Sequence, residues 1–283
     1  MNKPNFFDAC VVPTSLFNID YAKSGGDPGW QDLEECYNTN YLEDFSPVEN
    51  PIPKKIHFIW LGGPLPEIYD SNIQDWKNKN PNFEVILWND ESVAEFDMEN
   101  RDLFEKAPSW GNKSDILRYE ILNKYGGLYA DTDFLCTDSF DEVHENLSFY
   151  AGVCLEKPPQ MNNGIMASVP GHPILKSCIK NITLDNPWNL ACKATLVLYQ
   201  TGPWHLTTQI LSHIITNKKD IVLFPSQFFH PFPAAYRHQA NEELILSFLK
   251  PHTKAVHLWH TSWQEGSKYY CNPLWYKTLQ KNL

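Results

Sequence analysis

The sequence predicts an α/β fold in which one central sheet is flanked by helices. Short β-rich runs alternate with helical patterns from residue 55 onward, and such alternation is typical of a mostly parallel sheet. The chain has 283 residues, 42% of them hydrophobic and 20% charged, which is enough to bury a sizeable core. This composition excludes a disordered or fibrous chain.

The elements follow in order along the chain. The first expected strand is residues 55–61 (KIHFIWL). It ends at the Gly-Gly-Pro turn that follows. An amphipathic helix is expected at 66–80 and a second strand at 83–88. Ser114 to Tyr125 suits a helix with Ser114 as N-cap and Gly126 as C-cap, before a third strand at 127–130. Further strands are expected at 148–155, 164–169, 221–224 and 255–259, and further helices near 172–181, 189–199, 203–216 and 240–249.

Residues 1–50 differ from the rest of the chain. They are polar and acidic, with a Gly/Pro-rich stretch at 24–29 and a proline-rich break at 47–53. We therefore expect an N-terminal extension at 1–50 that packs on, or precedes, a main domain at 51–283.

Charge and cysteine content narrow the possible partners and compartment. The net charge is −11 and the pI is near 5.3, which disfavours sequence-independent binding to nucleic acid or to anionic lipid. The seven cysteines include no C-x-x-C pair. No signal peptide and no transmembrane segment is visible in the sequence. The expected location is the reducing cytoplasm.

An acidic pair, Asp131 and Asp133, directly follows the third expected strand. Ligands of open α/β sheets bind at the carboxyl ends of strands, and two adjacent carboxylates repel unless a divalent cation neutralises them. Asp115 and Arg118 are spaced i, i+3 on the preceding helix, so they share a face that can approach the pair. The alternatives are a solvated turn for the pair and a surface salt bridge for the helix residues.

The segment around these residues resembles a known family signature. It reads S-D-I-L-R-Y-E-I-L-N-K-Y-G-G-L-Y-A-D-T-D and is similar to the motif of glycosyltransferase family 32, the DXD-motif sugar transferases. Yeast mannosyltransferases, bacterial capsular polysaccharide enzymes and the glucosyltransferase domain of clostridial toxins share that motif. The resemblance extends over about residues 52–265, through blocks at 52–62, 162–173, 201–203 and 257–263, and says nothing about residues 1–50.

The resemblance implies a fold, a reaction and a cofactor. The fold would be the nucleotide-diphospho-sugar transferase (GT-A) type, with a single mixed central sheet, and residues 51–283 would be the catalytic domain. The reaction would move a hexose from a nucleotide sugar to an acceptor hydroxyl on a glycan with retention of configuration. Mn²⁺ or Mg²⁺ would bind Asp133 directly, and Asp131 would contact the donor's ribose or sugar and the metal shell. Asp115 and Arg118 would hold the donor sugar and diphosphate. A cation and an arginine both stabilise the charge on the leaving diphosphate.

The same resemblance assigns further donor contacts. Trp60 would stack on the nucleobase, Asn163 would bind the sugar, and Ser262 and Trp263 would close over the diphosphate. The alternatives are core packing for the two tryptophans and a plain turn for Asn163.

One histidine would complete the metal site, and the sequence leaves two alternatives, His257 and His260. The family often has Gly where this chain has Thr261, so the backbone at this point departs from the pattern. A lone histidine is also a common core residue.

The sequence leaves both substrates and two other functions open. Uridine- and guanosine-linked donors fit equally. One alternative function is a toxin-like transferase that modifies a host protein; the interval from Gly62 to Ser114 is short for that branch, which carries long helical insertions there. The other is a non-catalytic protein that binds nucleotide sugars or carbohydrate.

Overall fold

The protein is described here from a computed structural model of the whole chain. The structure describes residues 3–10, 28–43, 48–144, 146–154, 160–187, 189–262, 278–279 and 283.

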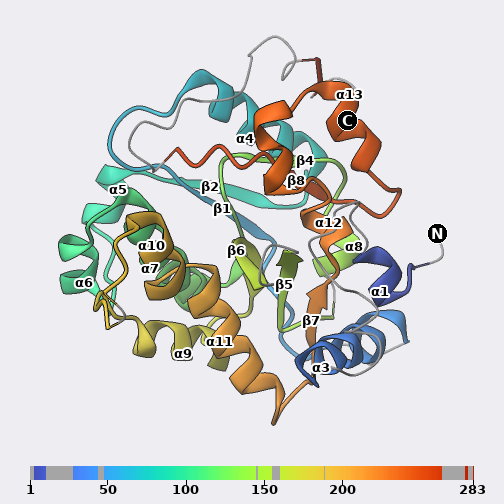
Figure 1. Cartoon of the computed structure of the whole chain (residues 1–283), viewed down its shortest axis with the longest axis horizontal. Helices are drawn as coiled ribbons and strands as arrows, with labels where there is room; N and C mark the ends of the chain where they lie inside the picture. The colour runs from blue at the N-terminus through green and yellow to red at the C-terminus, as the bar shows by residue number, and fades with distance from the viewer. Residues whose placement is uncertain are drawn as a thin grey trace.

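A six-stranded mixed sheet in the order β2-β1-β3-β6-β5-β7 forms the centre (Figure 1). Its strands are β1 (Lys55–Ile59), β2 (Glu84–Trp88), β3 (Gly127–Ala130), β5 (Phe149–Cys154), β6 (Gln160–Ser168) and β7 (Ile221–Phe224). The strand β1 runs parallel to β2 and β3, and β5 runs parallel to β7, whereas β6 is antiparallel to both of its neighbours. The predicted α/β class, with one mixed central sheet flanked by helices, is confirmed.

The antiparallel direction of β6 has a simple cause. Only residues 155–159 separate β5 from β6, and a parallel crossover needs about a dozen residues or more. The alternation of strands and helices predicted a mostly parallel sheet, because that pattern does not take the length of this connection into account. In contrast β1 and β3 are parallel neighbours, so Trp60 and Asp131, which follow them, emerge at the same edge of the sheet.

A second, two-stranded sheet was not predicted. It pairs β4 (Phe134–Cys136) antiparallel with β8 (Ala255–His257), with Phe134 opposite His257. The register brings the C-terminal part of the chain beside the acidic pair, because Asp133 immediately precedes β4. A strand of three residues is too short to show a hydrophobic period, which explains why only β8 was foreseen.

Helices lie on both sides of this scaffold. Between the strands come α4 (Glu67–Lys79), α5 (Asp90–Ala94), α6 (Arg101–Lys106), α7 (Trp110–Tyr125), α8 (Asp141–His144), α9 (Pro173–Asn181), α10 (Lys193–Gln200), α11 (Pro203–Ile214), α12 (Ser226–Phe229), the 3₁₀ helix η2 (Ala234–Gln239) and α13 (Glu242–Phe248). The helices α7, α9, α10 and α11 pack together next to β3 and β6, whereas α4 contacts β2 and β4 (Figure 1).

The start of α7 corrects one prediction. The N-cap is Ser109, whose side chain accepts a hydrogen bond from the backbone N–H of Asn112, and Ser114 lies inside the helix. The predicted C-cap is correct, because Gly126 ends the helix at a φ of +63°. The extra N-terminal turn brings Trp110 to the edge of the sheet, next to Gly62.

The described N-terminal residues pack against β7. They form α1 (Phe6–Ala9), α3 (Pro28–Tyr37) and the π-helical η1 (Asn38–Leu42). The rings of Tyr37 and Tyr41 contact Phe224, and Asn40 donates hydrogen bonds to the carbonyl oxygens of Lys218 and Ile221. These contacts join the segment to the main core.

In the part of the chain that the structure describes, no helix combines the length and hydropathy needed to cross a membrane.

Candidate active site

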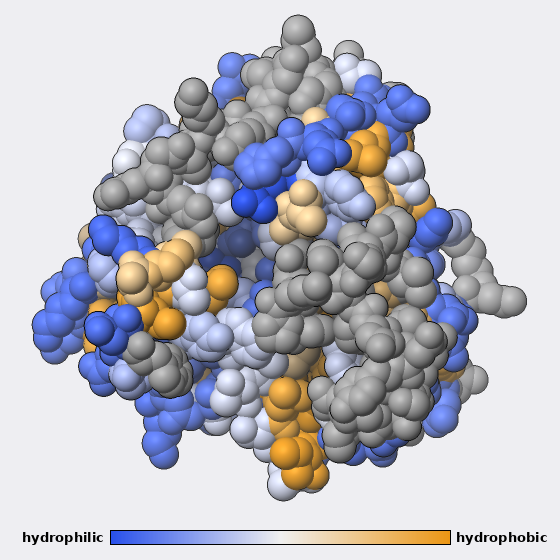
Figure 2. Space-filling view, in the orientation of Figure 1, coloured by the Kyte–Doolittle hydropathy of each residue, from blue (hydrophilic) through white to orange (hydrophobic). Residues whose placement is uncertain are grey.

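A cavity of about 420 Å³ lies at the carboxyl edge of β1 and β3. Side chains from the ends of these strands, from α7, from β6, from α10 and from residues 257–262 line it. Figure 2 shows this face of the molecule hollowed near its middle, beside α7 and α10. The described lining residues include most of the side chains that the sequence singled out: Trp60, Asp115, Arg118, Asp131, Asp133, Asn163, His257 and Ser262.

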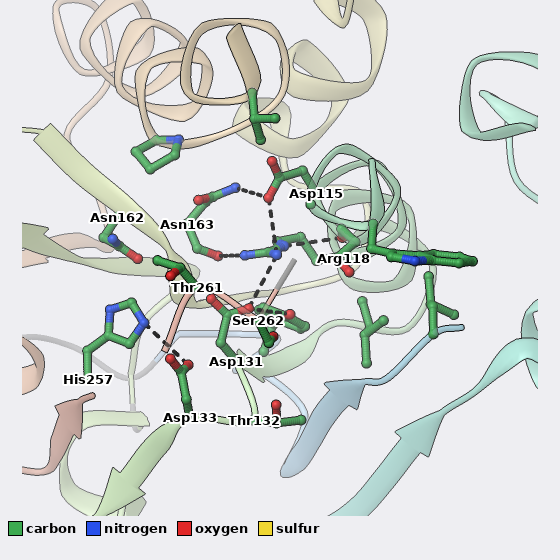
Figure 3. Close-up of a pocket in the computed structure, with 18 of the residues that line it drawn as sticks. Asp115, Arg118, Asp131, Thr132, Asp133, Asn162, Asn163, His257, Thr261 and Ser262 are labelled. Carbon is green, nitrogen blue, oxygen red and sulfur yellow. Dashed lines mark hydrogen bonds and ion pairs between the residues drawn. The ribbon is translucent and has the colours of Figure 1, made fainter. Parts of the chain in front are cut away.

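Arg118 lies between two carboxylates, as Figure 3 shows. Its Nη2 atom is 3.1 Å from Asp115 Oδ1 and 3.2 Å from Asp131 Oδ1, and its Nη1 donates to the carbonyl oxygen of Asn163 at 2.7 Å. The guanidinium is almost fully buried, and its carbon lies 4.5 Å from the centre of the Tyr129 ring. This geometry fixes the planar fork of Arg118 beside the acidic pair.

Burial sets the protonation of Asp115. It raises the pKa of this carboxyl to about 6, although Arg118 and a hydrogen bond from Thr201 favour the ionised form. Burial also raises the pKa of Asp131, and Arg118 opposes that shift. Both carboxylates therefore depend on Arg118 for their charge.

Asp133 is the most strongly ionised member of the cluster. Burial alone would raise its pKa, but His257 beside it, together with hydrogen bonds, holds the pKa well below its usual range. His257 Nε2 lies 3.3 Å from Asp133 Oδ1, and the backbone N–H of His260 donates to Asp133 Oδ2 at 2.8 Å.

Three of these groups fit a divalent cation. Asp131, Asp133 and His257 each offer a ligand atom, and the three atoms lie within 4.8 Å of one another. Carboxylate oxygens suit Mg²⁺ and Mn²⁺, and an imidazole nitrogen is a common ligand of transition metals. The side chain of the other candidate, His260, turns elsewhere: its Nδ1 hydrogen-bonds the Tyr69 hydroxyl at 3.0 Å.

The remaining predicted contacts lie around the same cavity. Trp60 is half-buried, its ring centre is 5.0 Å from that of Tyr69, and its indole N–H donates to the Pro64 carbonyl oxygen. The Asn163 amide donates to Asp115 Oδ1 at 2.8 Å, and Ser262 lies exposed at the opening. Trp263, predicted to close over the diphosphate, lies outside the described residues.

Two positioning residues were missed by the sequence reasoning. Thr201 donates from its hydroxyl to Asp115 Oδ2 at 2.8 Å and accepts from the Asn112 side chain at 3.1 Å. Buried Asn72 on α4 donates to the carbonyl oxygens of Thr132 and Phe134, on either side of Asp133. Each residue had a weak signal in the sequence. Thr201 begins a Thr-Gly-Pro block to which no role was assigned, and Asn72 lies one helical turn before Trp76, on the buried face of α4.

We expect Thr201→Val to move the acid limb of the pH–activity profile upward. The hydroxyl favours the ionised form of Asp115, so its loss raises the pKa of Asp115 from about 6. A hydrogen bond to a charged group is worth enough to move this midpoint by about one pH unit. The family resemblance implies that ionised Asp115 accepts a hydrogen bond from a donor hydroxyl, and protonation below that midpoint weakens this acceptor. The measurement is kcat/KM against pH, with Thr201→Ser as the matched control; an unmoved limb in the valine variant contradicts the assignment.

The terminal segment departs from its expected pattern in an informative way. Thr261, where the family often has Gly, has a φ of +47°, and Trp259 has a φ of +58°. A left-handed backbone is costly for β-branched side chains such as threonine, which explains why the family often has glycine at the position of Thr261. The segment nevertheless keeps the bend that brings the His260 N–H to Asp133.

Comparisons with known proteins agree with the motif. A family model described as the glycosyltransferase sugar-binding region containing the DXD motif matches residues 66–150. Inositol phosphoceramide mannosyltransferase 3 of Schizosaccharomyces pombe is 30% identical over 199 residues, which cover 69% of this chain and 52% of that protein. Mannosyl phosphorylinositol ceramide synthase SUR1 of Saccharomyces cerevisiae is 32% identical over 62% of this chain and 45% of its own length.

The chain thus spans about half the length of these curated relatives. Among solved structures, the PaToxG glycosyltransferase is 19% identical, covers 69% of this chain and 79% of its own, and has a TM-score of 0.46. The similarity to DXD-motif sugar transferases, predicted from the motif, is confirmed.

Proposed function

We propose that this chain, whose residues 66–150 belong to the sugar-binding region of the DXD-motif glycosyltransferases, is a metal-dependent glycosyltransferase. It moves a hexose from a nucleotide sugar to an acceptor hydroxyl, with retention at the anomeric carbon. Residues 51–283 form its catalytic domain, and the cytoplasm is its proposed location.

One observation carries the proposal: an arginine and a cation-binding cluster meet in a single cavity. Asp131 belongs to both, because it pairs with Arg118 at 3.2 Å and lies within 4.8 Å of the ligand atoms of Asp133 and His257. A diphosphate bound there has positive charge on two sides. Mn²⁺ or Mg²⁺ would be held by Asp131, Asp133 and His257, and would stabilise the negative charge on the departing diphosphate.

The chain's own residues prepare the donor for transfer. Arg118 holds diphosphate or sugar oxygens through its fixed fork, and Asp115 accepts a hydrogen bond from a donor hydroxyl. The bond between the anomeric carbon and the diphosphate oxygen breaks, and the bond to the acceptor oxygen forms on the same face. The acceptor proton passes to the leaving diphosphate oxygen, so no further base is needed.

This front-face route agrees with the carboxylates that are present. Among the described lining residues these are Asp115, Asp131 and Asp133, and each is engaged with Arg118 or with His257. A double displacement needs a carboxylate that is free to attack the anomeric carbon from the opposite face.

Donor and acceptor can be proposed from the relatives. Because the curated relatives are named mannosyltransferases, GDP-mannose is the first donor to test, followed by UDP-glucose and UDP-galactose. The proposed acceptor is a hydroxyl of a glycan, and inositol phosphoceramide is the first lipid acceptor to test because the relatives' names contain it.

The toxin-like alternative is disfavoured by the region between β1 and α7. Its helices are α4, α5 and α6, of which the longest has 13 residues. A hexose added to one protein of a target-cell lysate, detected by mass spectrometry, would revive that alternative.

A thermal-shift screen tests the proposal. Each nucleotide sugar is added with Mn²⁺ and with EDTA, and binding to the native state raises the melting temperature by mass action. We expect at least one donor to raise the melting temperature more with Mn²⁺ than with EDTA, and then to be hydrolysed or transferred with Mn²⁺. Binding without turnover, with every candidate acceptor, favours a non-catalytic binding protein instead.

We expect Trp60→Leu to weaken binding of UDP or GDP about 5- to 150-fold, because stacking of a base on an aromatic ring contributes about 1–3 kcal/mol. Dissociation constants from calorimetry measure the loss, and Trp60→Phe should restore part of it. Trp204→Leu is the matched control, since Trp204 is also half-buried but stacks on Tyr199 instead of lining the cavity. Equal binding by Trp60→Leu and wild type contradicts the stacking role.

A further inference from the structure

One side chain of α4 contacts both Trp60, which lines the cavity, and His260, which lies next to Asp133. Tyr69 is 1% exposed, and its ring packs against Trp60 with centres 5.0 Å apart. Its hydroxyl forms a hydrogen bond of 3.0 Å with Nδ1 of His260, which is 3% exposed. A buried bond of this kind, shielded from water, has a well-defined geometry and is costly to leave unmade.

The segment that contains His260 needs such a contact. Its backbone N–H donates to Asp133 Oδ2 at 2.8 Å, and the residues on either side have left-handed backbone, with φ of +58° at Trp259 and +47° at Thr261. Such conformations cost on the order of 1–2 kcal/mol per residue, so surrounding contacts must hold them. The Tyr69 hydroxyl is one such contact, and the hydrogen bond from the Trp259 indole to the Phe232 carbonyl oxygen is another.

We propose that Tyr69 is a positioning residue that joins the base-binding side of the cavity to the metal-binding side. Its ring supports Trp60, and its hydroxyl fixes His260, whose backbone N–H orients the Asp133 carboxylate. The inference rests on the proposed function, in which Trp60 binds the base and Asp133 the cation. It also gives His260, considered from the sequence as a ligand, a different role.

The two contacts of Tyr69 are chemically separable. Tyr69→Phe keeps the ring next to Trp60 and removes only the hydroxyl, whereas Tyr69→Leu removes both the ring contact and the hydrogen bond. The first variant should therefore affect cation binding alone, and the second should affect cation binding and nucleotide binding together.

The test measures binding, with Mn²⁺ alone and UDP or GDP in EDTA as the probes. We expect Tyr69→Phe to weaken Mn²⁺ binding about tenfold, the lower end of the range for groups that orient metal ligands, and to leave metal-free nucleotide binding unchanged. His260→Ala should weaken Mn²⁺ binding equally, and the double variant should lose no more than either single variant.

Tyr150→Phe is the matched control. The Tyr150 hydroxyl forms a similarly buried bond of 3.1 Å with His144 Nδ1, outside the cavity lining. This variant should lose comparable stability and bind Mn²⁺ as wild type does. The proposal is overturned if Tyr69→Phe binds Mn²⁺ like wild type, or if Tyr150→Phe weakens it as much. If the wild-type protein binds Mn²⁺ and nucleotide but Tyr69→Phe binds Mn²⁺ equally well, only the role of Tyr69 is overturned. If the wild-type protein binds neither, the proposed function is overturned as well.

Discussion

Asp133→Asn is expected to lower glycosyl transfer about 10³-fold or more while the protein stays folded. The amide replaces the most strongly ionised carboxylate of the cation cluster, so the charge that stabilises the leaving diphosphate is no longer held in place. Asparagine is chosen over alanine because its carbonyl oxygen can still accept the hydrogen bond from the His260 N–H. Alanine would leave that buried donor unsatisfied.

Two opposing effects keep the stability of this variant near that of wild type. Because the pKa of Asp133 is lowered on folding, its ionised form stabilises the fold above the usual carboxyl pKa, and that contribution is lost with the charge. Removing the charge also relieves repulsion with Asp131. We expect the melting temperature to change by less than about 2 °C, which corresponds to about 1 kcal/mol for a chain of this size.

The measurements are turnover of the nucleotide sugar and the melting temperature with and without Mn²⁺. Asp141→Asn is the control, because Asp141 pairs with Lys54 away from the cavity lining and should not matter for turnover. Near-normal turnover by Asp133→Asn, or an undiminished rise in melting temperature with Mn²⁺, is inconsistent with a cation held by Asp133.

Arg118→Ala is expected to lower the free energy of unfolding by about 3–5 kcal/mol and to abolish transfer. Removing one partner of a buried ion pair leaves the other charge uncompensated, and here two carboxylates, Asp115 and Asp131, lose the same partner. Burial already raises the pKa of Asp115 to about 6, and loss of Arg118 raises it further. The loss of stability should therefore be larger at pH 8 than at pH 5.

The sign of that pH dependence follows from linkage. A carboxyl with a raised folded-state pKa contributes stability below its usual pKa, and this contribution is lost as the pH rises through the raised value. Urea unfolding at the two pH values measures it. Arg237→Ala is the control, since Arg237 is half-buried and donates to the Ala234 carbonyl oxygen, outside the cavity lining. A loss below about 1 kcal/mol for Arg118→Ala contradicts the burial argument.

Arg118→Lys should keep most of the stability and still transfer poorly, because a lysine lacks the planar fork of the guanidinium.

The sequence predicted that Asp115, Arg118, Asp131 and Asp133 lie close together, and it did so for a physical reason. Helical spacing placed the first two on one face of α7, and the third strand placed the last two at its carboxyl end. The strand-helix alternation likewise predicted most of the sheet. These are local patterns that a single segment displays on its own.

Contacts between distant segments were not visible in the same way. The strands β4 and β8 pair only through tertiary structure, so the sequence did not show that His257, which lies opposite Phe134, is near Asp131 and Asp133. Thr201 reaches Asp115 across 86 positions, and nothing in the local sequence marks that bond. The shifted N-cap of α7 has a local cause: Gly111 and Asn112 are weak helix formers and hid the true start at Ser109.

The central claim is that this cavity activates a nucleotide sugar with the help of a divalent cation. Its most direct test follows hydrolysis or transfer of GDP-mannose, UDP-glucose and UDP-galactose by wild-type protein in EDTA and after addition of Mn²⁺. We predict turnover of at least one donor with Mn²⁺, none in EDTA, and none by Asp133→Asn under either condition. Turnover that persists in EDTA, or that Asp133→Asn retains, would contradict the claim.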